Sequence, residues 1–346
     1  MKGFGFEEHG TFDRLREVEI PEPQPGRGEV RVALEAAAFN HVDRFTLRGI
    51  EGVEIPRPHV LGSDGAGTVD KVGPDVRDLL AGSRVLINPG LWDGTCEACK
   101  SGREVFCRNY RILGEHTQGT VTSHVVVPRR NVYALPAGFS AAQAAAVPLV
   151  FQTAWRALKT VGEVVAGDRV AVIGAGGGTA TSAVQVAKLL DATVVVASRS
   201  AEKAERARAL GADGAVAFDD DHPLDRVLWE WSDRTGIDVI FDSVGAPTVP
   251  RSLRALARGG RVVVIGATEG PQVPVDIRTL FWRQASIRGS TMANRHEFEE
   301  VLDHLSRGRL KPVIDSEFPY DRAAEAFRRL EAPELFGKVV VTLPSS

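Results

Sequence analysis

Apolar runs and helix-like stretches alternate through the middle of the chain, between about residue 170 and residue 290. The predicted strands are residues 170–173, 193–197, 215–218, 238–241 and 261–265, and a run near Ile287. The predicted helices are the segment carrying Ala183, Val186, Ala187 and Leu190, and residues 201–210, 224–231 and 252–257. Strands joined through helices favour right-handed crossovers. We therefore predict an α/β fold with a doubly wound, parallel six-stranded sheet.

The first of these strands leads into a turn with almost no side chains. Residues 174–178 read Gly-Ala-Gly-Gly-Gly, and a helical pattern follows. Such a turn lets backbone N–H groups at a helix N-terminus approach a pyrophosphate closely. A glycine pattern alone is also typical of a flexible loop, but the order strand, turn and helix favours a dinucleotide site. The predicted cofactor contacts in this Rossmann-type domain are Gly174, Gly176, Gly177, Gly178, Thr179 and Ala180.

The first 140 residues or so follow the two-residue period of strands instead. Apolar side chains occupy alternate positions in residues 30–36, and apolar runs return at residues 84–87 and 124–127. Near the end of the chain, a helical stripe from Phe298 to Leu305 precedes an apolar strand at residues 337–343. We expect this last segment to return to the first domain.

The change of pattern along the chain defines the expected domains. Residues 1–145 form a β-rich domain, and residues 88–110 within it form a separate lobe. Residues 146–288 form the dinucleotide-binding domain. Residues 289–346 then return and complete the first domain.

Composition narrows the class of protein without changing this organisation. Of the 346 residues, 43% are hydrophobic and 25% are charged, which is ordinary for a globular protein with two cores. A net charge of −3 argues against a nucleic-acid surface, which needs clustered positive charge. No apolar run approaches the roughly 18 residues of a membrane span, and the first residues lack a long apolar core. We expect a cytoplasmic protein that binds neither nucleic acid nor membrane.

All three cysteines lie between positions 96 and 107. An odd number within so short a segment does not suit disulfides, and metal ligation explains the cluster better. Asp93 precedes Cys96 by three residues and so repeats the spacing from Cys96 to Cys99. A carboxylate and three thiolates, from Asp93, Cys96, Cys99 and Cys107, make an acceptable closed shell for a structural Zn²⁺. Three buried cysteines without a metal are the alternative.

Taken together, the chain resembles the medium-chain dehydrogenase/reductase superfamily, which includes zinc-containing alcohol dehydrogenases and quinone oxidoreductases. The resemblance implies a GroES-like β domain that the C-terminus completes, with a Rossmann domain inserted between its parts. The family's lobe carries four cysteines around a structural zinc, and here Asp93 stands in place of the first cysteine. One structural zinc per chain and a homodimer or homotetramer are what the family implies.

The same family holds a catalytic zinc with three ligands that this chain lacks at the matching segments. Asn40 replaces a thiolate, Ser63 replaces an imidazole, and Leu149 replaces the last ligand. Asp64 alone cannot hold Zn²⁺ in an open catalytic site, so we expect no catalytic zinc. A zinc alcohol dehydrogenase that uses Asp64 and His41 as unconventional ligands is the alternative.

Asn40 and Asp43 resemble instead the NxxD segment of the quinone oxidoreductase branch, which implies metal-free hydride transfer to quinones or α,β-unsaturated carbonyl compounds. Such acceptors need only a hydrogen-bond donor at the developing oxyanion. The candidate donors are Asn40, His41 and Ser63, with Asp43 orienting one of them, although each could simply be a satisfied polar residue in the cleft. A homologue that binds NADPH without turnover is a third hypothesis.

The end of the second predicted strand bears on the choice of cofactor. NAD-preferring enzymes put a carboxylate there, whereas this strand ends in Ser198 and Arg199, with Lys203 one turn later. Arg199 can make a charge-assisted bond to a 2′-phosphate, so NADPH is favoured over NADH. A solvated Arg199 at a helix start is the alternative. The family resemblance adds further candidate cofactor contacts at Asn40, Val244, Gly266, Ala267, Ser290 and Lys338.

Overall fold

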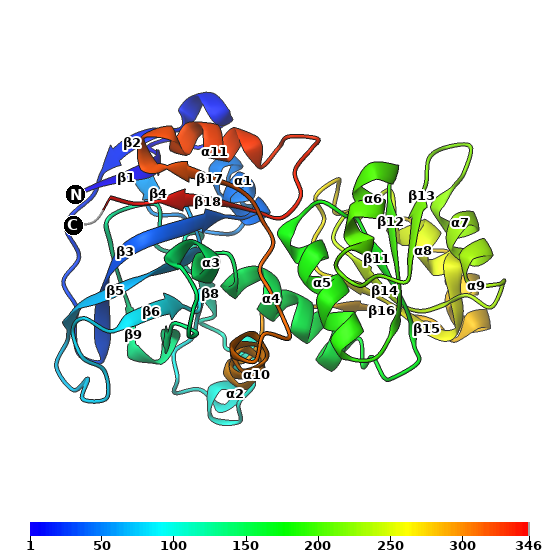
Figure 1. Ribbon diagram of the computed structural model, residues 1–346, viewed down its shortest axis with the longest axis horizontal. Helices are drawn as coiled ribbons and strands as arrows, with labels where there is room; N and C mark the ends of the chain where they lie inside the picture. Colours follow the sequence, from blue (N-terminus) through cyan, green and yellow to red (C-terminus); the bar gives the residue numbers. More distant parts are fainter. Residues whose placement is uncertain (345–346) are drawn as a thin grey trace. The chain divides into compact units, whose positions relative to one another are not determined.

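The computed structural model describes residues 1–344, and the chain divides into two compact units (Figure 1). The first unit consists of Met1–Leu149, Asn294–Ser306 and the chain from Lys311 onward. The second unit consists of Val150–Ala293 and Arg307–Leu310, so most of it lies between two parts of the first along the sequence. None of the helices formed by residues 1–344 has the length and apolarity that a membrane crossing requires.

The second unit is built on a six-stranded sheet whose neighbouring strands are all parallel. The strands are β11 (Arg169–Ile173), β12 (Thr193–Ser198), β13 (Gly214–Ala217), β14 (Ile237–Asp242), β15 (Leu256–Val264) and β16 (Ser286–Gly289). Their order across the sheet is β13-β12-β11-β14-β15-β16. The strand order therefore reverses between β11 and β14, as in a doubly wound fold, and the predicted fold class is confirmed.

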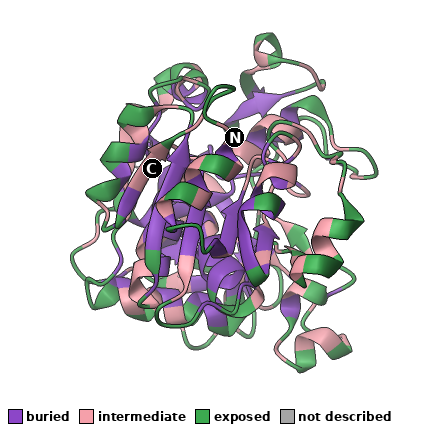
Figure 2. Cartoon of the chain, turned by 90° about the vertical axis from the view of Figure 1, so that its right-hand side faces the viewer, coloured by how far each residue is buried: buried purple, intermediate pink, exposed green. Residues whose placement is uncertain are grey.

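Helices connect these strands. They are α5 (Gly178–Leu189), α6 (Ala201–Arg208), α7 (Leu224–Trp231), α8 (Val249–Ala255) and α9 (Ile277–Arg283), and α4 (Pro148–Trp155) and the π-helical turn Arg156–Val161 precede the first strand. Figure 2 shows buried strands and helices with exposed outer faces. The predicted helix at 252–257 starts earlier, at Val249, because the fixed backbone of Pro250 suits a first helical turn. It also ends earlier, since Leu256 already pairs with Ile237 in the sheet.

The first unit is rich in antiparallel strands. Its larger sheet runs β10-β6-β5-β3-β18-β17, with β9 also on β3, and a smaller sheet runs β2-β1-β4. The strands are β1 (Lys2–Phe6), β2 (Arg16–Glu19), β3 (Glu29–Phe39), β4 (His59–Val60), β5 (Asp64–Val72), β6 (Arg84–Ile87), β7 (Gly90–Leu91), β8 (Arg111–Ile112), β9 (His124–Pro128), β10 (Val132–Ala134), β17 (Ile314–Pro319) and β18 (Lys338–Thr342). Strand β18 pairs with β3, so two strands that lie about 300 residues apart along the sequence belong to the same sheet.

Helices and 3₁₀ turns complete the first unit. The helices are α1 (His41–Arg48), α2 (Glu97–Lys100), α3 (Ala141–Ala145), α10 (Arg295–Ser306) and α11 (Ala323–Arg329), with 3₁₀ turns at Phe12–Arg14, Glu104–Phe106, Arg129–Asn131 and Tyr320–Arg322. Of these, α11 contacts both β17 and β18, and α3 contacts β3. The sequence from 323 onward thus supplies both a strand and a covering helix.

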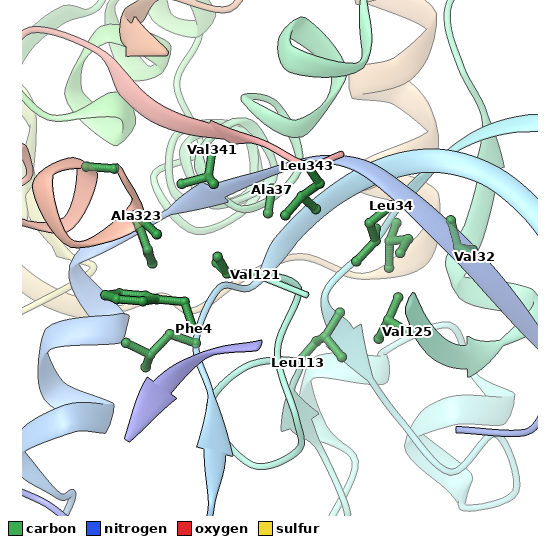
Figure 3. Close-up of a cluster of buried hydrophobic side chains, with 14 of the residues drawn as sticks. Phe4, Val32, Leu34, Ala37, Leu113, Val121, Val125, Ala323, Val341 and Leu343 are labelled. Carbon is green, nitrogen blue, oxygen red and sulfur yellow. The ribbon is translucent and has the colours of Figure 1, made fainter. Parts of the chain in front are cut away.

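Strand β3 forms the centre of this unit's core. Its residues Val32, Leu34 and Ala37 belong to one buried cluster, together with side chains of β1, β9, β18 and α11, as Figure 3 shows. Ala36 and Ala38 point to the other side, into a cluster with the alanines of α3. Small side chains allow α3 to pack closely there. Both faces of β3 are therefore buried at its C-terminal end, which fixes the chain where the candidate site begins.

Candidate functional site

Asn40 and Asp43 lie where β3 runs into α1. Asn40 is the N-cap residue of α1, and its backbone N–H donates to Asp43 Oδ2 at 2.7 Å. The other carboxylate oxygen, Oδ1, accepts the backbone N–H of Gly62 at 2.7 Å. Burial raises the pKa of the Asp43 carboxyl to about 7, although these two N–H groups act in the opposite direction. Asp43 therefore ties the start of α1 to the segment that carries Ser63 and Asp64.

A buried network joins the ends of three strands beside this turn. The Lys338 ammonium donates to Asp64 Oδ2 at 2.8 Å, to Asn40 Oδ1 at 2.5 Å and to the Phe39 carbonyl at 2.9 Å. The Lys338 and Asp64 side chains are only 3% and 0% exposed. Three acceptors use all three ammonium protons. Because an ammonium can only donate, it also fixes which end of the Asn40 amide faces Asp64.

Asp64 is fully engaged by this network. Its Oδ2 accepts a bond from Asn40 Nδ2 at 2.9 Å in addition to the bond from Lys338, and its Oδ1 accepts the backbone N–H of Leu149 at 2.8 Å. The negative charge of Asp64 is thus balanced by an ammonium at hydrogen-bond distance. Among residues 1–344, Asp64 Oδ2 is the acceptor that the structure gives for Asn40 Nδ2, which carries a second N–H.

Ser63 and His41 accompany the network. The Ser63 hydroxyl is buried and has no hydrogen-bond partner among the residues that the structure describes. His41 is the first residue of α1, and burial, with help from the nearby positive charges of Arg44 and Lys338, lowers its pKa to about 4. His41 is therefore a neutral imidazole at physiological pH, so it can donate or accept a hydrogen bond without carrying charge.

The glycine turn of the second unit has the geometry of a phosphate site. Gly174, directly after β11, has φ +89°, a conformation that favours glycine, and its N–H donates to Ala197 O at 2.8 Å. Gly177 is the N-cap of the 12-residue helix α5, so the first-turn N–H groups of Gly178, Thr179 and Ala180 have no acceptor within the helix. Gly176 lies between these two positions. The residues present fit a dinucleotide pyrophosphate.

The remaining cofactor candidates of the second unit follow the C-terminal ends of neighbouring parallel strands. Ser198 ends β12, Val244 follows β14, and Gly266 follows β15 together with Ala267. Ser290 follows β16, and its hydroxyl is buried without a partner in the described chain. Because these strands are parallel, all of these positions lie at the same edge of the sheet as the glycine turn.

The segment after β12 contains one contact that the sequence did not reveal. Ser198 is buried, and its hydroxyl accepts the N–H of Ser200, whose own hydroxyl accepts the N–H of Lys203 at the start of α6. Arg199 points outward and forms an ion pair with Glu269 from the loop after β15. The structure therefore brings a carboxylate to the residue predicted to recognise the 2′-phosphate.

Of the cofactor candidates, Lys338 and Asn40 belong to the first unit and are bonded to each other. The glycine turn and the strand ends belong to the second unit. The Lys338 ammonium is buried and already has three oxygen partners, so in this arrangement it offers no proton to a phosphate.

The four predicted metal ligands come together in the first unit. One ligand atom from each of Asp93, Cys96, Cys99 and Cys107 lies within 4.8 Å of the others. Cys96 caps α2, and Cys107 follows the 3₁₀ turn Glu104–Phe106. Three thiolates and a carboxylate suit a tetrahedral Zn²⁺ with no position left for substrate. Within residues 1–344 no other group of three or more His, Cys, Asp or Glu side chains gathers in this way.

The Asp93 carboxylate is held by neutral donors. Its Oδ1 accepts the backbone N–H groups of Thr95 at 2.7 Å and Cys96 at 3.0 Å, and its Oδ2 accepts Asn109 Nδ2 at 3.0 Å. The N–H of Cys96, followed by that of Thr95, holds the pKa of Asp93 well below its usual range. The carboxylate is therefore ionised and oriented before any ion binds.

The sequence matches two protein families with this architecture. Residues 26–137 match the Alcohol dehydrogenase GroES-like domain, and residues 178–307 match the Zinc-binding dehydrogenase family. The crystal structure of an NAD-dependent alcohol dehydrogenase is 40% identical, with a TM-score of 0.94 over 99% of this chain and 100% of that chain. The chain belongs to the zinc-type alcohol dehydrogenase-like family of medium-chain dehydrogenases/reductases.

Further members of this family illustrate its range. An acryloyl-coenzyme A reductase from Metallosphaera sedula is 30% identical over 99% of this chain and 100% of its own length. A cobalt- and zinc-bound thermostable alcohol dehydrogenase from Pyrobaculum aerophilum is 32% identical, with a TM-score of 0.88 over 99% of both chains. Like other members of the family, this chain is an NAD(P)-dependent oxidoreductase.

Proposed function

We propose that this oxidoreductase uses NADPH to reduce quinones or α,β-unsaturated carbonyl compounds without a catalytic metal. The Lys338 network carries the proposal. A dication that used Asp64 as a ligand would have to approach a carboxylate whose two oxygens are occupied and whose charge an ammonium already balances. In the same region His41 is the only imidazole offered by the zinc hypothesis, and Asn40 and Ser63 are poor zinc ligands.

The donors that remain suit a developing oxyanion. Bound NADPH supplies the hydride, and reduction of a conjugated carbonyl leaves negative charge on the carbonyl oxygen. The second N–H of Asn40 Nδ2 and the unpartnered hydroxyl of Ser63 are the two neutral donors that we propose receive this charge. The bond from Lys338 to Asn40 Oδ1 polarises the amide and strengthens its N–H as a donor.

Supporting evidence for the acceptor class comes from chemistry and from a relative. A saturated alcohol needs a Lewis acid to stabilise its alkoxide, whereas a conjugated carbonyl accepts hydride directly. The relative from Metallosphaera sedula is named an acryloyl-coenzyme A reductase, and acryloyl-coenzyme A is an α,β-unsaturated thioester, so it is a conjugated carbonyl compound. We therefore favour conjugated acceptors over alcohols.

Two further parts of the proposal concern the cofactor and the structural metal. Ser198 carries no charge that would repel a 2′-phosphate, which Arg199 and Lys203 can attract, and this supports NADPH over NADH. The Asp93 cluster would hold one zinc ion per chain, which would fix the lobe without touching substrate.

The test is to follow NADPH and NADH oxidation against a panel of quinones, enals and enones, with and without a chelator, while measuring zinc content. The proposal expects turnover that survives chelation and close to one zinc ion per chain. Near two zinc ions per chain, with alcohol oxidation lost when the labile ion is removed, would favour the zinc alcohol dehydrogenase hypothesis instead. Saturable NADPH binding with no turnover on any acceptor would identify a non-catalytic homologue.

A further inference from the structure

The loop after β15 holds Glu269 in a defined place at the edge of the sheet. The N–H of Ile265 donates to Asp242 O at 2.9 Å, and the N–H of Glu269 donates to Val244 O at 2.9 Å. At the end of this loop, Gly270 O accepts the N–H of Ala246 at 3.0 Å. The loops after β14 and β15 are therefore bonded to each other, and the backbone of Glu269 is fixed.

From this position the Glu269 carboxylate reaches Arg199, which follows β12. The side chains are 40% and 72% exposed, so the ion pair is open to solvent. Exposed ion pairs contribute little to stability, and an incoming anion can displace one partner without a large penalty. Ser198 beside it is buried and neutral, so Glu269 supplies the carboxylate that the end of β12 lacks.

A carboxylate and a guanidinium have opposite preferences for the two cofactors. The guanidinium makes charge-assisted hydrogen bonds to the 2′-phosphate of NADPH. A carboxylate repels that phosphate but accepts a hydrogen bond from the 2′-hydroxyl of NADH. A site with both groups in contact balances the two preferences.

We propose that the Arg199–Glu269 pair is the cofactor selector, in which Arg199 recognises the 2′-phosphate and Glu269 limits that preference by competing for Arg199. The inference rests on the proposed cofactor site at the edge of the second unit's sheet. Glu269 is then a specificity-determining residue, and removing its charge shifts the protein further toward NADPH.

The test measures binding of adenosine 2′,5′-bisphosphate and of 5′-AMP by calorimetry, because neither ligand carries a nicotinamide and no turnover is needed. Glu269→Gln is expected to raise affinity for the bisphosphate about tenfold while 5′-AMP changes little or weakens. Arg199→Gln is expected to lower bisphosphate affinity about tenfold or more and to leave 5′-AMP unchanged. Both effects should shrink as salt is added.

Glu230→Gln is the matched control, because Glu230 forms a solvent-exposed pair with Arg226 on α7 and its substitution changes the net charge identically. If Glu269→Gln alters the ratio of the two affinities no more than Glu230→Gln does, the selector is overturned while the cofactor site stands. If the wild-type protein binds neither adenosine ligand, the proposed cofactor site is overturned and this inference with it.

Discussion

The Asp93 cluster and the Asn40–Asp64–Lys338 network both gather polar groups around a carboxylate in the first unit, but only one of them suits a cation. At Asp93, neutral N–H groups hold the carboxylate and leave its charge in place beside three thiols. At Asp64, an ammonium cancels the charge. The partners of a carboxylate, more than its presence in a motif, therefore decide whether it can ligate a metal.

The largest expected effect follows from removing the ammonium. Lys338→Met leaves Asp64 buried without its counter-charge and should lower the free energy of unfolding by about 3–5 kcal/mol. Urea denaturation of the purified protein measures this. Asp64→Asn added to Lys338→Met should recover part of the loss, and Lys71→Met, on the exposed part of β5, is the control. A loss no larger than that of Lys71→Met would contradict the counter-charge role.

The pKa of Asp43 is raised in the folded protein, whereas the pKa of Asp93 is lowered. Folding raises the pKa of Asp43 from 3.8 to about 7, so the native state binds this proton more tightly than the unfolded chain. Protonated Asp43 therefore makes its full contribution to the free energy of unfolding below about pH 4. This contribution, up to about 4 kcal/mol, is lost as the pH rises through 7. Asp43→Asn should flatten the decline in unfolding free energy over this range. Parallel curves for the wild type and the variant would contradict the raised pKa.

The Asn40–Asp64–Lys338 network should also matter for catalysis. Asn40→Ala removes the donor that Lys338 and Asp64 orient, and should reduce kcat on an enone or quinone by about 10²- to 10³-fold. Binding of NADPH, followed by fluorescence, is measured in parallel, because Asn40 is also a candidate cofactor contact, and kcat is compared at saturating NADPH. Ser63→Ala serves as the comparison for kcat, because it removes the other proposed donor, whose hydroxyl is not held by the network. A rise in KM without a fall in kcat would assign Asn40 to ground-state binding instead.

The smallest effect concerns the orientation of the Asp93 carboxylate. Asn109→Ala should lower zinc affinity about tenfold, because Asp93 Oδ2 loses the donor that orients it. Competition with a chromophoric chelator measures the affinity directly. Asp93→Cys should act in the opposite direction by completing a four-thiolate shell. Equal zinc affinity in all three proteins would show that Asp93 is not a ligand.

Local patterns in the sequence were sufficient for much of the fold. Each apolar run of the second unit became a strand, because a strand buried on both faces needs apolar side chains throughout. The metal cluster could also be predicted from the sequence, since its four residues lie within 15 positions of one another and their spacing already indicates a shared ion. The start of α8 differed from the prediction because Pro250 favours a first turn that the apolar pattern does not reveal.

Contacts between distant segments could not be predicted in the same way. Lys338 lies 274 residues from Asp64 and 298 from Asn40, and only the pairing of β18 with β3 brings them together. Glu269 lies 70 residues from Arg199, in a loop with no motif of its own. A charged residue at a strand end is informative only when the neighbouring strand in the sheet is known, and strand order depends on the whole fold.

The position of Lys338 on β18 also sets an order of assembly during synthesis. The ribosome completes β3, β5 and the entire second unit before it adds the lysine that balances Asp64. Until then a nascent chain cannot bury Asp64 in its native surroundings without an uncompensated charge. The first unit should consequently become protease-resistant only after its last strand has emerged from the exit tunnel, although the second unit can fold earlier.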